Sequence, residues 1–126
     1  MTIQKQEVHV TSTSGEPRGI EVIEETFKPS GLVFAVGGEL DIATAPDLER
    51  AVLRRRAPGD DVVLDLAGLR FMDSTGLRIL LRARTEARTG RWNLYMRNVP
   101  DNVQRLFSIS GVEETVPPPP PPELAG

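Results

Sequence analysis

The chain has 126 residues, 39% of them hydrophobic, and this length fits one domain with an ordinary apolar core. It contains no cysteine, which excludes disulfides and thiolate zinc sites and suits a reducing cytoplasm, where we expect the protein to act. The formal net charge of -3 argues against nucleic acid as a partner, and no stretch approaches the ~20 apolar residues that would cross a membrane.

The first elements predicted in chain order are an arm and a β-hairpin. Residues 1–19 are polar and rich in Thr, Ser and Gly, which predicts a flexible arm with a strand near Val8 and Val10. Two strand-like runs, 20–24 and 32–36, follow, and the sequence Lys-Pro-Ser-Gly between them suits a tight turn. The folded domain is therefore expected to begin with this hairpin.

A helix and a buried strand are predicted next. The second hairpin strand is expected to end at Gly37, and Thr44 is a candidate N-cap with Asp47 three residues later, an approximate capping box. An apolar stripe at helical spacing follows it. Residues 62–66 form a short apolar run that is typical of a strand buried on both faces. Gly68 is predicted to mark the turn after this strand.

The second half of the chain predicts two more helices and two more strands. Their expected positions are a helix over 77–90, a strand over 91–96, a helix over 100–111 and a short edge strand over 112–116. The complete order, β-β-α-β-α-β-α-β, predicts an α/β fold. We expect a mixed central β-sheet of four to five strands with helices packed against it.

Six consecutive prolines follow the last predicted strand, at 117–122. Because proline cannot donate a backbone N–H, this run ends regular strand pairing and predicts a polyproline II tail. The tail is either a disordered end or a ligand for an aromatic groove. The predicted organisation is therefore an arm over 1–19, one domain over 20–116 and a proline-rich tail over 117–126.

The segment Asp73-Ser74-Thr75-Gly76 lies where the buried strand leads into the next helix. Ser and Asp are common N-caps, so capping by itself leaves the role of Ser74 open. Three side-chain acceptors where one would suffice, and a glycine that permits close approach by another backbone, favour a functional role. A phosphate on Ser74 would add roughly 1.5 to 2 negative charges beside Asp73. Like charges ~4 Å apart cost about 4 kcal/mol at an effective dielectric near 20, so this site could switch a partner off.

Catalysis by Ser74 would need a base, normally a histidine within hydrogen-bond reach. The only histidine is His9, which lies in the predicted arm. A metal site without cysteine would need clustered carboxylates, and Asp60-Asp61 has the pattern of a loop. We therefore expect no enzymatic activity, no metal and no other cofactor.

Charge is distributed unevenly along the chain. Between Arg50 and Arg105 there are twelve arginines and six acidic residues, whereas the acidic surplus lies upstream. Such arginines are either solvated helix faces or a surface that attracts an acidic protein partner.

Four motifs, in this order, resemble the STAS domain, a family that joins sulfate transporters with anti-sigma factor antagonists. They are Gly38-Glu39-Leu40-Asp41, Val63-Leu64-Asp65-Leu66, the run Phe71-Met72-Asp73-Ser74-Thr75-Gly76-Leu77, and the segment from Val103 to Val112. The resemblance covers residues from about 20 to 116. It implies the STAS fold.

The resemblance also implies a function. In antagonists of this kind the serine after the motif Asp, here Ser74, is phosphorylated by a partner that is both anti-sigma factor and serine kinase. The unphosphorylated chain would bind the anti-sigma factor and free a sigma factor, and a serine phosphatase would restore binding after phosphorylation. The resemblance places the partner-binding residues at Asp41, Thr44, Met72, Asp73, Thr75, Gly76, Leu77 and Arg78.

Two features depart from the family pattern. The proline tract begins where a last helix should start, so part of the sheet is expected to be exposed, or covered by the N-terminal arm or by a second copy in a homodimer. Arg78 stands where close antagonists often have a small residue, and it could alter partner choice or pair with a phosphate.

Two alternatives to the phosphorylation switch remain open at this point. One is a constitutive STAS scaffold in a signalling assembly, in which Ser74 is merely a cap. The other is a small-molecule module that binds an anion or nucleotide at the helix N-terminus, although the chain has no Gly-rich phosphate loop.

Overall fold

The computed structural model describes residues 3–4, 10–11, 19–27, 31–53 and 57–121, and the structural statements below concern these residues. Most of the predicted arm, including His9, lies outside the described residues, as does the tight turn predicted between the hairpin strands.

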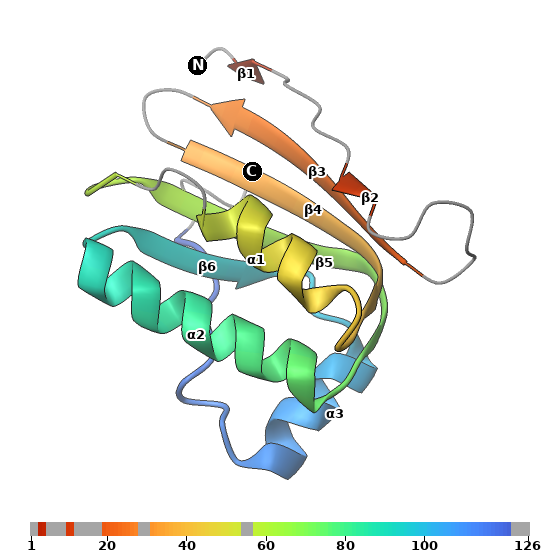
Figure 1. Cartoon of the computed structure of the whole chain (residues 1–126). Coiled ribbons are helices and arrows are strands. Elements are labelled where there is room, and N and C mark those ends of the chain that lie inside the picture. The colour runs from red at the N-terminus through yellow and green to blue at the C-terminus, as the bar shows by residue number, and fades with distance from the viewer. Residues whose placement is uncertain (1–2, 5–9, 12–18, 28–30, 54–56, 122–126) are drawn as a thin grey trace.

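A mixed β-sheet forms the centre of the molecule (Figure 1). Its order is β1 (Ile3–Gln4), β3 (Ile20–Phe27), β4 (Gly31–Leu40), β5 (Asp61–Met72), β6 (Asn93–Arg97), and β2 (Val10–Thr11) also pairs with β3. The β3–β4 hairpin is antiparallel, as predicted, and β5 pairs in parallel with both β4 and β6. In the described residues the sheet has six strands, of which β3, β4, β5 and β6 have five residues or more. The two-residue strands β1 and β2 of the arm both pair with β3.

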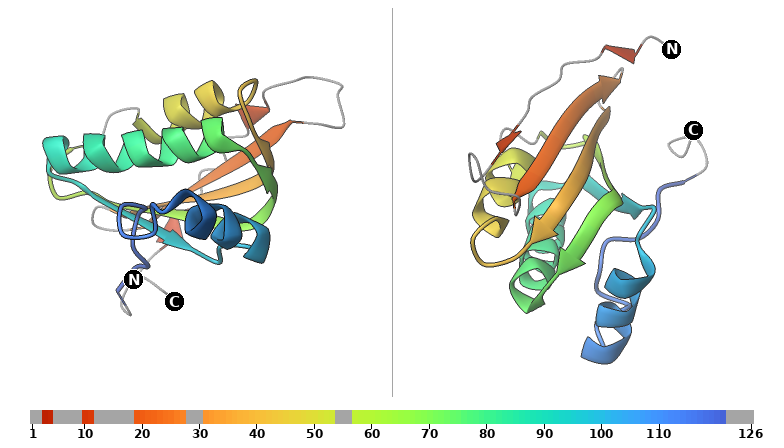
Figure 2. Two further views of the ribbon diagram at one scale, coloured as in Figure 1. Left: turned by 90° about the horizontal axis from the view of Figure 1, so that it is seen from below. Right: turned by 90° about the vertical axis from the view of Figure 1, so that its right-hand side faces the viewer.

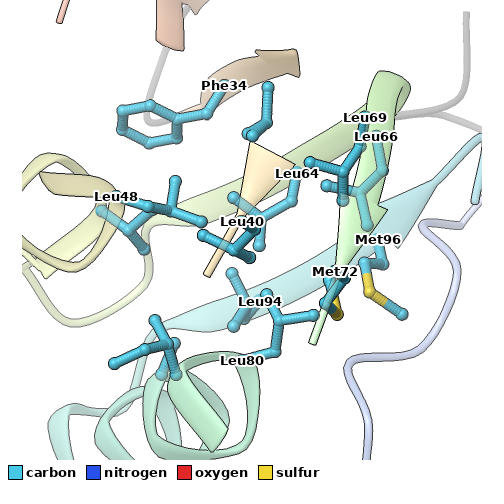
Figure 3. Packing of buried hydrophobic residues seen from close by; sticks show 14 of the residues in the cluster. Phe34, Leu40, Leu48, Leu64, Leu66, Leu69, Met72, Leu80, Leu94 and Met96 are labelled. Carbon is cyan, nitrogen blue, oxygen red and sulfur yellow. The ribbon is translucent and has the colours of Figure 1, made fainter. Parts of the chain in front are cut away.

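Within the described ranges the chain forms three helices, α1 (Ala45–Leu53), α2 (Ser74–Gly90) and α3 (Asp101–Ser110). The first two cover one face of the sheet, and α3 lies on the other side (Figure 2). Because β4, β5 and β6 follow one another across the sheet, crossovers of one hand place α1 and α2 on the same face. The core between them contains Leu40, Leu64 and Leu80, each at most 1% exposed (Figure 3).

The two central strands are longer than the sequence predicted. Strand β4 continues past Gly37 to Leu40, and Gly68 lies inside β5 rather than in a turn. The register between these strands shifts at this point, and a Cβ on Gly68 would lie 3.2 Å from the Cα of Gly37. Glycine therefore permits β4 and β5 to approach each other closely where the register shifts. This register shift bends the two strands and carries their ends toward α2.

Side chains also join β5 to β6. The carboxylate of Asp65 accepts hydrogen bonds from Nε of Arg97 at 3.0 Å, from Nδ2 of Asn98 at 3.3 Å and from the N–H of Ala67 at 3.0 Å. Burial alone would raise the pKa of Asp65, but these hydrogen bonds outweigh it and hold the pKa below its ordinary value. The carboxylate is therefore charged at neutral pH and ties the two strands together.

The edge strand predicted over 112–116 is wrong, because these residues form turns. The chain then runs back to the sheet, where the carbonyl of Pro118 accepts a hydrogen bond from the N–H of Met96 at 2.8 Å. Pro117 is buried. The proline-rich segment itself therefore covers part of β6, a cover that the sequence did not predict.

Candidate functional site

Two loops meet at the carboxyl ends of β4 and β5 (Figure 1). Neighbouring parallel strands end at the same edge of a sheet, which is where α/β folds commonly place their sites. Residues 41–44 connect β4 to α1, and Asp73 alone separates β5 from α2. The N–H of Asp73 donates to the carbonyl of Leu40 at 3.2 Å. The start of α2 is thereby fixed against the end of β4.

Asp73, not Ser74, is the N-cap of α2. Its Oδ1 accepts hydrogen bonds from the N–H of Thr75 at 2.9 Å and of Gly76 at 3.1 Å. Ser74 is the first residue of the helix, and its side chain is exposed. Within the described part of the chain the Ser74 hydroxyl makes no hydrogen bond. Since Asp73 satisfies the first-turn N–H groups, the hydroxyl is free for another reaction or partner.

The loop between β4 and α1 is held by Asp41 and Thr44. Oδ1 of Asp41 accepts from the N–H groups of Ala43 and Thr44 at 3.0 and 3.1 Å. The Thr44 hydroxyl donates to the carbonyl of Glu39 at 2.7 Å and accepts from the N–H of Asp41 at 3.0 Å. This internal network leaves Ile42 in the middle of the loop, 76% exposed.

The capping box predicted from Thr44 to Asp47 is wrong. The Thr44 hydroxyl bonds to the loop that precedes it, as above, and the carboxylate of Asp47 forms an ion pair with Arg50. Thr44 is 3% exposed, and its hydroxyl bonds to Glu39 and Asp41 rather than to the first turn of α1. The Thr44 hydroxyl therefore bonds within the loop instead of capping the first turn of α1.

Gly76 lets the first turn of α2 lie directly on β4. A Cβ at this position would be 2.8 Å from both Cγ and the carbonyl oxygen of Leu40, and 2.9 Å from Cγ of Met72. The close backbone approach predicted for Gly76 is thus made by this chain's own strand. Leu40 and Met72 themselves lie in the core (Figure 3). The position of Ser74 is therefore set by core packing as well as by the cap.

The predicted partner-binding residues and Ser74 fall into three classes by exposure. Four are buried: Thr44, Met72, Gly76 and Leu77. Asp41, Asp73 and Thr75 are half-buried, whereas Ser74 and Arg78 are exposed one helical turn apart on the same face of α2. Ile42 was missed, because sequence patterns assign an isolated apolar residue to the core. Its signal in the sequence is its place between Asp41 and Thr44, two polar residues that lie between the predicted strand and the predicted helix.

Arginine dominates the charge of α2 near this site. Arg82 donates to Oε2 of Glu49 at 2.8 Å and so joins α2 to α1, whereas Arg78 has no ion pair within the described residues. In that same part of the chain, no group of three or more acidic or histidine side chains could hold a metal ion. None of the helices that the structure describes is long and apolar enough to cross a membrane.

Comparison with known proteins agrees with this geometry. The family model described as "Mlab, STAS domain" matches residues 23–118. An anti-sigma-B factor antagonist of Staphylococcus epidermidis is 39% identical over 80 residues, which cover 63% of this chain and 74% of the relative. Its counterpart in Staphylococcus aureus strain NCTC 8325 is 34% identical over 93 residues, or 73% of this chain and 86% of the relative.

A solved structure is also similar along most of its length. The crystal structure of an anti-sigma factor antagonist from Mycobacterium paratuberculosis matches with a TM-score of 0.66 at 27% sequence identity, covering 86% of this chain and 92% of that one. The fold, the strand-to-helix site and the sequence relatives are thus mutually consistent. The chain therefore belongs to the STAS domain family, and its relatives there are bacterial anti-sigma factor antagonists.

Proposed function

We propose that this chain is an anti-sigma factor antagonist that binds an anti-sigma factor when Ser74 is unmodified and releases it when Ser74 is phosphorylated. The observation that carries the proposal is the exposed Ser74 hydroxyl, which has no hydrogen bond within the described part of the chain and lies beside a cap that Asp73 already fills. The names of the relatives support the class of partner. The anti-sigma factor would itself be the serine kinase, and a serine phosphatase would reverse the modification.

We define the switch surface as the exposed residues Ile42, Ser74 and Arg78. Ile42 lies in the loop after Leu40, and Ser74 and Arg78 lie in the first turns of α2, whose start the Asp73–Leu40 hydrogen bond fixes against the end of β4. An exposed isoleucine offers an apolar anchor for a partner, and an arginine that has no ion pair with any described residue offers a contact for an acidic one. Ser74 lies on the same surface, so a charge placed there would enter the interface.

The remaining predicted residues would act by positioning the switch surface. Thr44 and Asp41 shape the loop that presents Ile42, and Asp73 orients the first turn of α2. Met72, Gly76 and Leu77 pack beneath that turn, and Thr75 donates its backbone N–H to the cap. The burial of Thr44, Met72, Gly76 and Leu77 leaves these four residues little surface with which to touch a partner.

Phosphorylation would act without refolding the domain. The Ser74 hydroxyl has no hydrogen bond to lose among the described residues, and the carboxylate of Asp73 keeps its two backbone contacts. The modification would add about 1.5 to 2 negative charges next to that carboxylate. In a packed interface the phosphate would lose its hydration or be repelled by the neighbouring carboxylate. Either effect costs a few kcal/mol of binding free energy, which is a factor of hundreds in affinity.

The two alternatives have less support. A constitutive scaffold would retain Ser74 as a helix cap, but the hydrogen bonds at the start of α2 go to Asp73. An anion-binding module would use the same helix terminus, where the Asp73 carboxylate already accepts the N–H groups of Thr75 and Gly76. No contact of the described residues favours either alternative over the antagonist.

Binding through the switch surface can be tested with two equally exposed isoleucines. Ile42→Ser is expected to weaken binding to the anti-sigma factor about tenfold, because a partly buried isoleucine anchor contributes roughly 1.5 kcal/mol. Ile109→Ser, on the outer face of α3, is the matched control, since the side chains are 76% and 77% exposed. Isothermal titration of both unphosphorylated variants measures the effect. Equal affinities of the two would show that the partner does not bind at the switch surface.

A further inference from the structure

The chain that follows α3 returns along the outer edge of β6 (Figure 2). Because β6 ends the strand order of the described residues, its N–H and C=O groups on the side away from β5 face no further strand there. The N–H of Met96 points to that side and donates to the carbonyl of Pro118 at 2.8 Å. Pro117, one residue earlier, is buried. We call residues 112–121 the proline strap.

The strap is also held from α2. Nη1 of Arg84 donates to the carbonyl of Glu114 at 3.0 Å and to the carbonyl of Val116 at 2.5 Å. A tight turn precedes these contacts, in which the N–H of Thr115 donates to the carbonyl of Val112 at 2.8 Å. One guanidinium therefore fixes the strap just before the prolines reach the sheet edge.

The chemistry of proline makes the strap an unusual neighbour for a strand. A true strand both donates and accepts along an edge, whereas prolines 117–121 carry carbonyls and no N–H. The strap can thus satisfy the N–H of Met96 but cannot extend the ladder. Proline at a sheet edge is one of the means by which proteins prevent pairing between edges.

The strap is attached at a few points rather than packed throughout. Between the strap, β6 and α3 there is a hollow of about 780 Å³, lined by Met96, Phe107 and Gln104 among others. Met96 and Phe107 are nevertheless only 5% and 2% exposed. Displacing the strap would uncover apolar side chains and an unpaired edge at the same place.

We propose that the proline strap is an edge guard that keeps this chain monomeric by blocking β6 from pairing with β6 of a second copy. A second copy is the expected occupant because an edge strand can be self-complementary under two-fold symmetry: the N–H and C=O groups of one copy meet those of the other in antiparallel pairing. The apolar side chains that the strap leaves behind would be buried in the same contact. The guard acts at the opposite edge of the sheet from β1 and independently of the switch surface.

The test loosens the strap in the full-length chain with the double substitution Arg84→Gln and Pro117→Ser. Amide hydrogen exchange by NMR is expected to be about tenfold faster at Met96, since one of its protecting contacts is lost. The amide of Leu64, in the centre of the sheet, should be unchanged, which distinguishes release of the strap from global unfolding. Light scattering should then report a mass that rises with concentration toward that of a dimer.

A matched control alters the same residue types away from the contacts. Arg105→Gln with Pro46→Ser replaces an exposed arginine of α3 and an exposed proline of α1, both outside the strap, and it should remain monomeric with wild-type exchange at Met96. If Met96 exchanged faster in the Arg84→Gln, Pro117→Ser variant while its mass stayed that of a monomer, the edge-guard proposal would be overturned. Unchanged exchange at Met96 would overturn the anchoring role assigned to Arg84 and Pro117.

Discussion

Ser74→Asp is expected to bind the anti-sigma factor at least about a hundredfold more weakly than the wild-type chain. The substitution places a second carboxylate beside Asp73 on the switch surface. At ~4 Å and an effective dielectric near 20, such a pair costs about 4 kcal/mol in a packed interface. Even part of this cost lowers the affinity a hundredfold, because every 1.4 kcal/mol of binding free energy changes the affinity about tenfold. Isothermal titration against the purified partner measures it.

The matched control for this substitution is Ser74→Asn, which has nearly the same shape as Asp and no charge. It should keep most of the affinity, and so should Ser74→Ala. All three variants should unfold at about the wild-type temperature, because the Ser74 side chain bonds to nothing in the described structure and Asp73 still caps α2. If Ser74→Asp and Ser74→Asn bound equally well, charge at this position would not control the partner.

Gly76→Ala is expected to lower the free energy of unfolding by about 2 kcal/mol, although alanine is the better helix former. Intrinsic propensity alone would favour alanine by ~1 kcal/mol. The new Cβ, however, would lie 2.8 Å from the carbonyl oxygen of Leu40, a backbone atom that cannot rotate away. Overpacking of this kind costs typically 1–3 kcal/mol or more, so the steric contact should prevail. Urea denaturation measures the difference.

Thr85→Ala is the control for Gly76→Ala, because Thr85 is exposed on the same helix and faces no strand. It should be neutral or slightly stabilising. Gly76→Ala should also weaken partner binding, since a shift of the first turn of α2 moves Ser74 relative to Ile42. A variant at Gly76 as stable as wild type would mean that α2 is not fixed against Leu40 in solution.

Much of the fold could be predicted from the sequence, because its signals are local. Apolar residues at helical spacing and a glycine stop predicted α2, and Pro100 with Gly111 bounded α3 correctly. Alternating and continuous apolar runs predicted the hairpin and the central strand. The lengths of β4 and β5 were missed because their extension depends on the pairing of Gly37 with Gly68, thirty-one residues apart.

The site was predictable to a lesser extent. The motif around Ser74 stands out in the sequence, but Asp and Ser are almost equally good caps, so only the hydrogen bonds of Asp73 assign the cap. Thr44 was predicted as a cap because the loop network around Asp41 has no simple sequence pattern. The proline strap could not be predicted, since its contacts with Met96 and Arg84 join segments far apart in the chain.

The proposed switch requires that phosphorylation of Ser74 alone separates this chain from its anti-sigma factor. The direct measurement incubates the wild-type chain with the anti-sigma factor kinase and ATP, locates the phosphate by mass spectrometry and titrates the product against the same partner. We predict one phosphate on Ser74, normal uptake by Thr75→Ala, no uptake by Ser74→Ala, and binding that is lost on phosphorylation and restored by a serine phosphatase. Phosphate at another residue, or a chain phosphorylated at Ser74 that binds as tightly as the unmodified one, would contradict the claim.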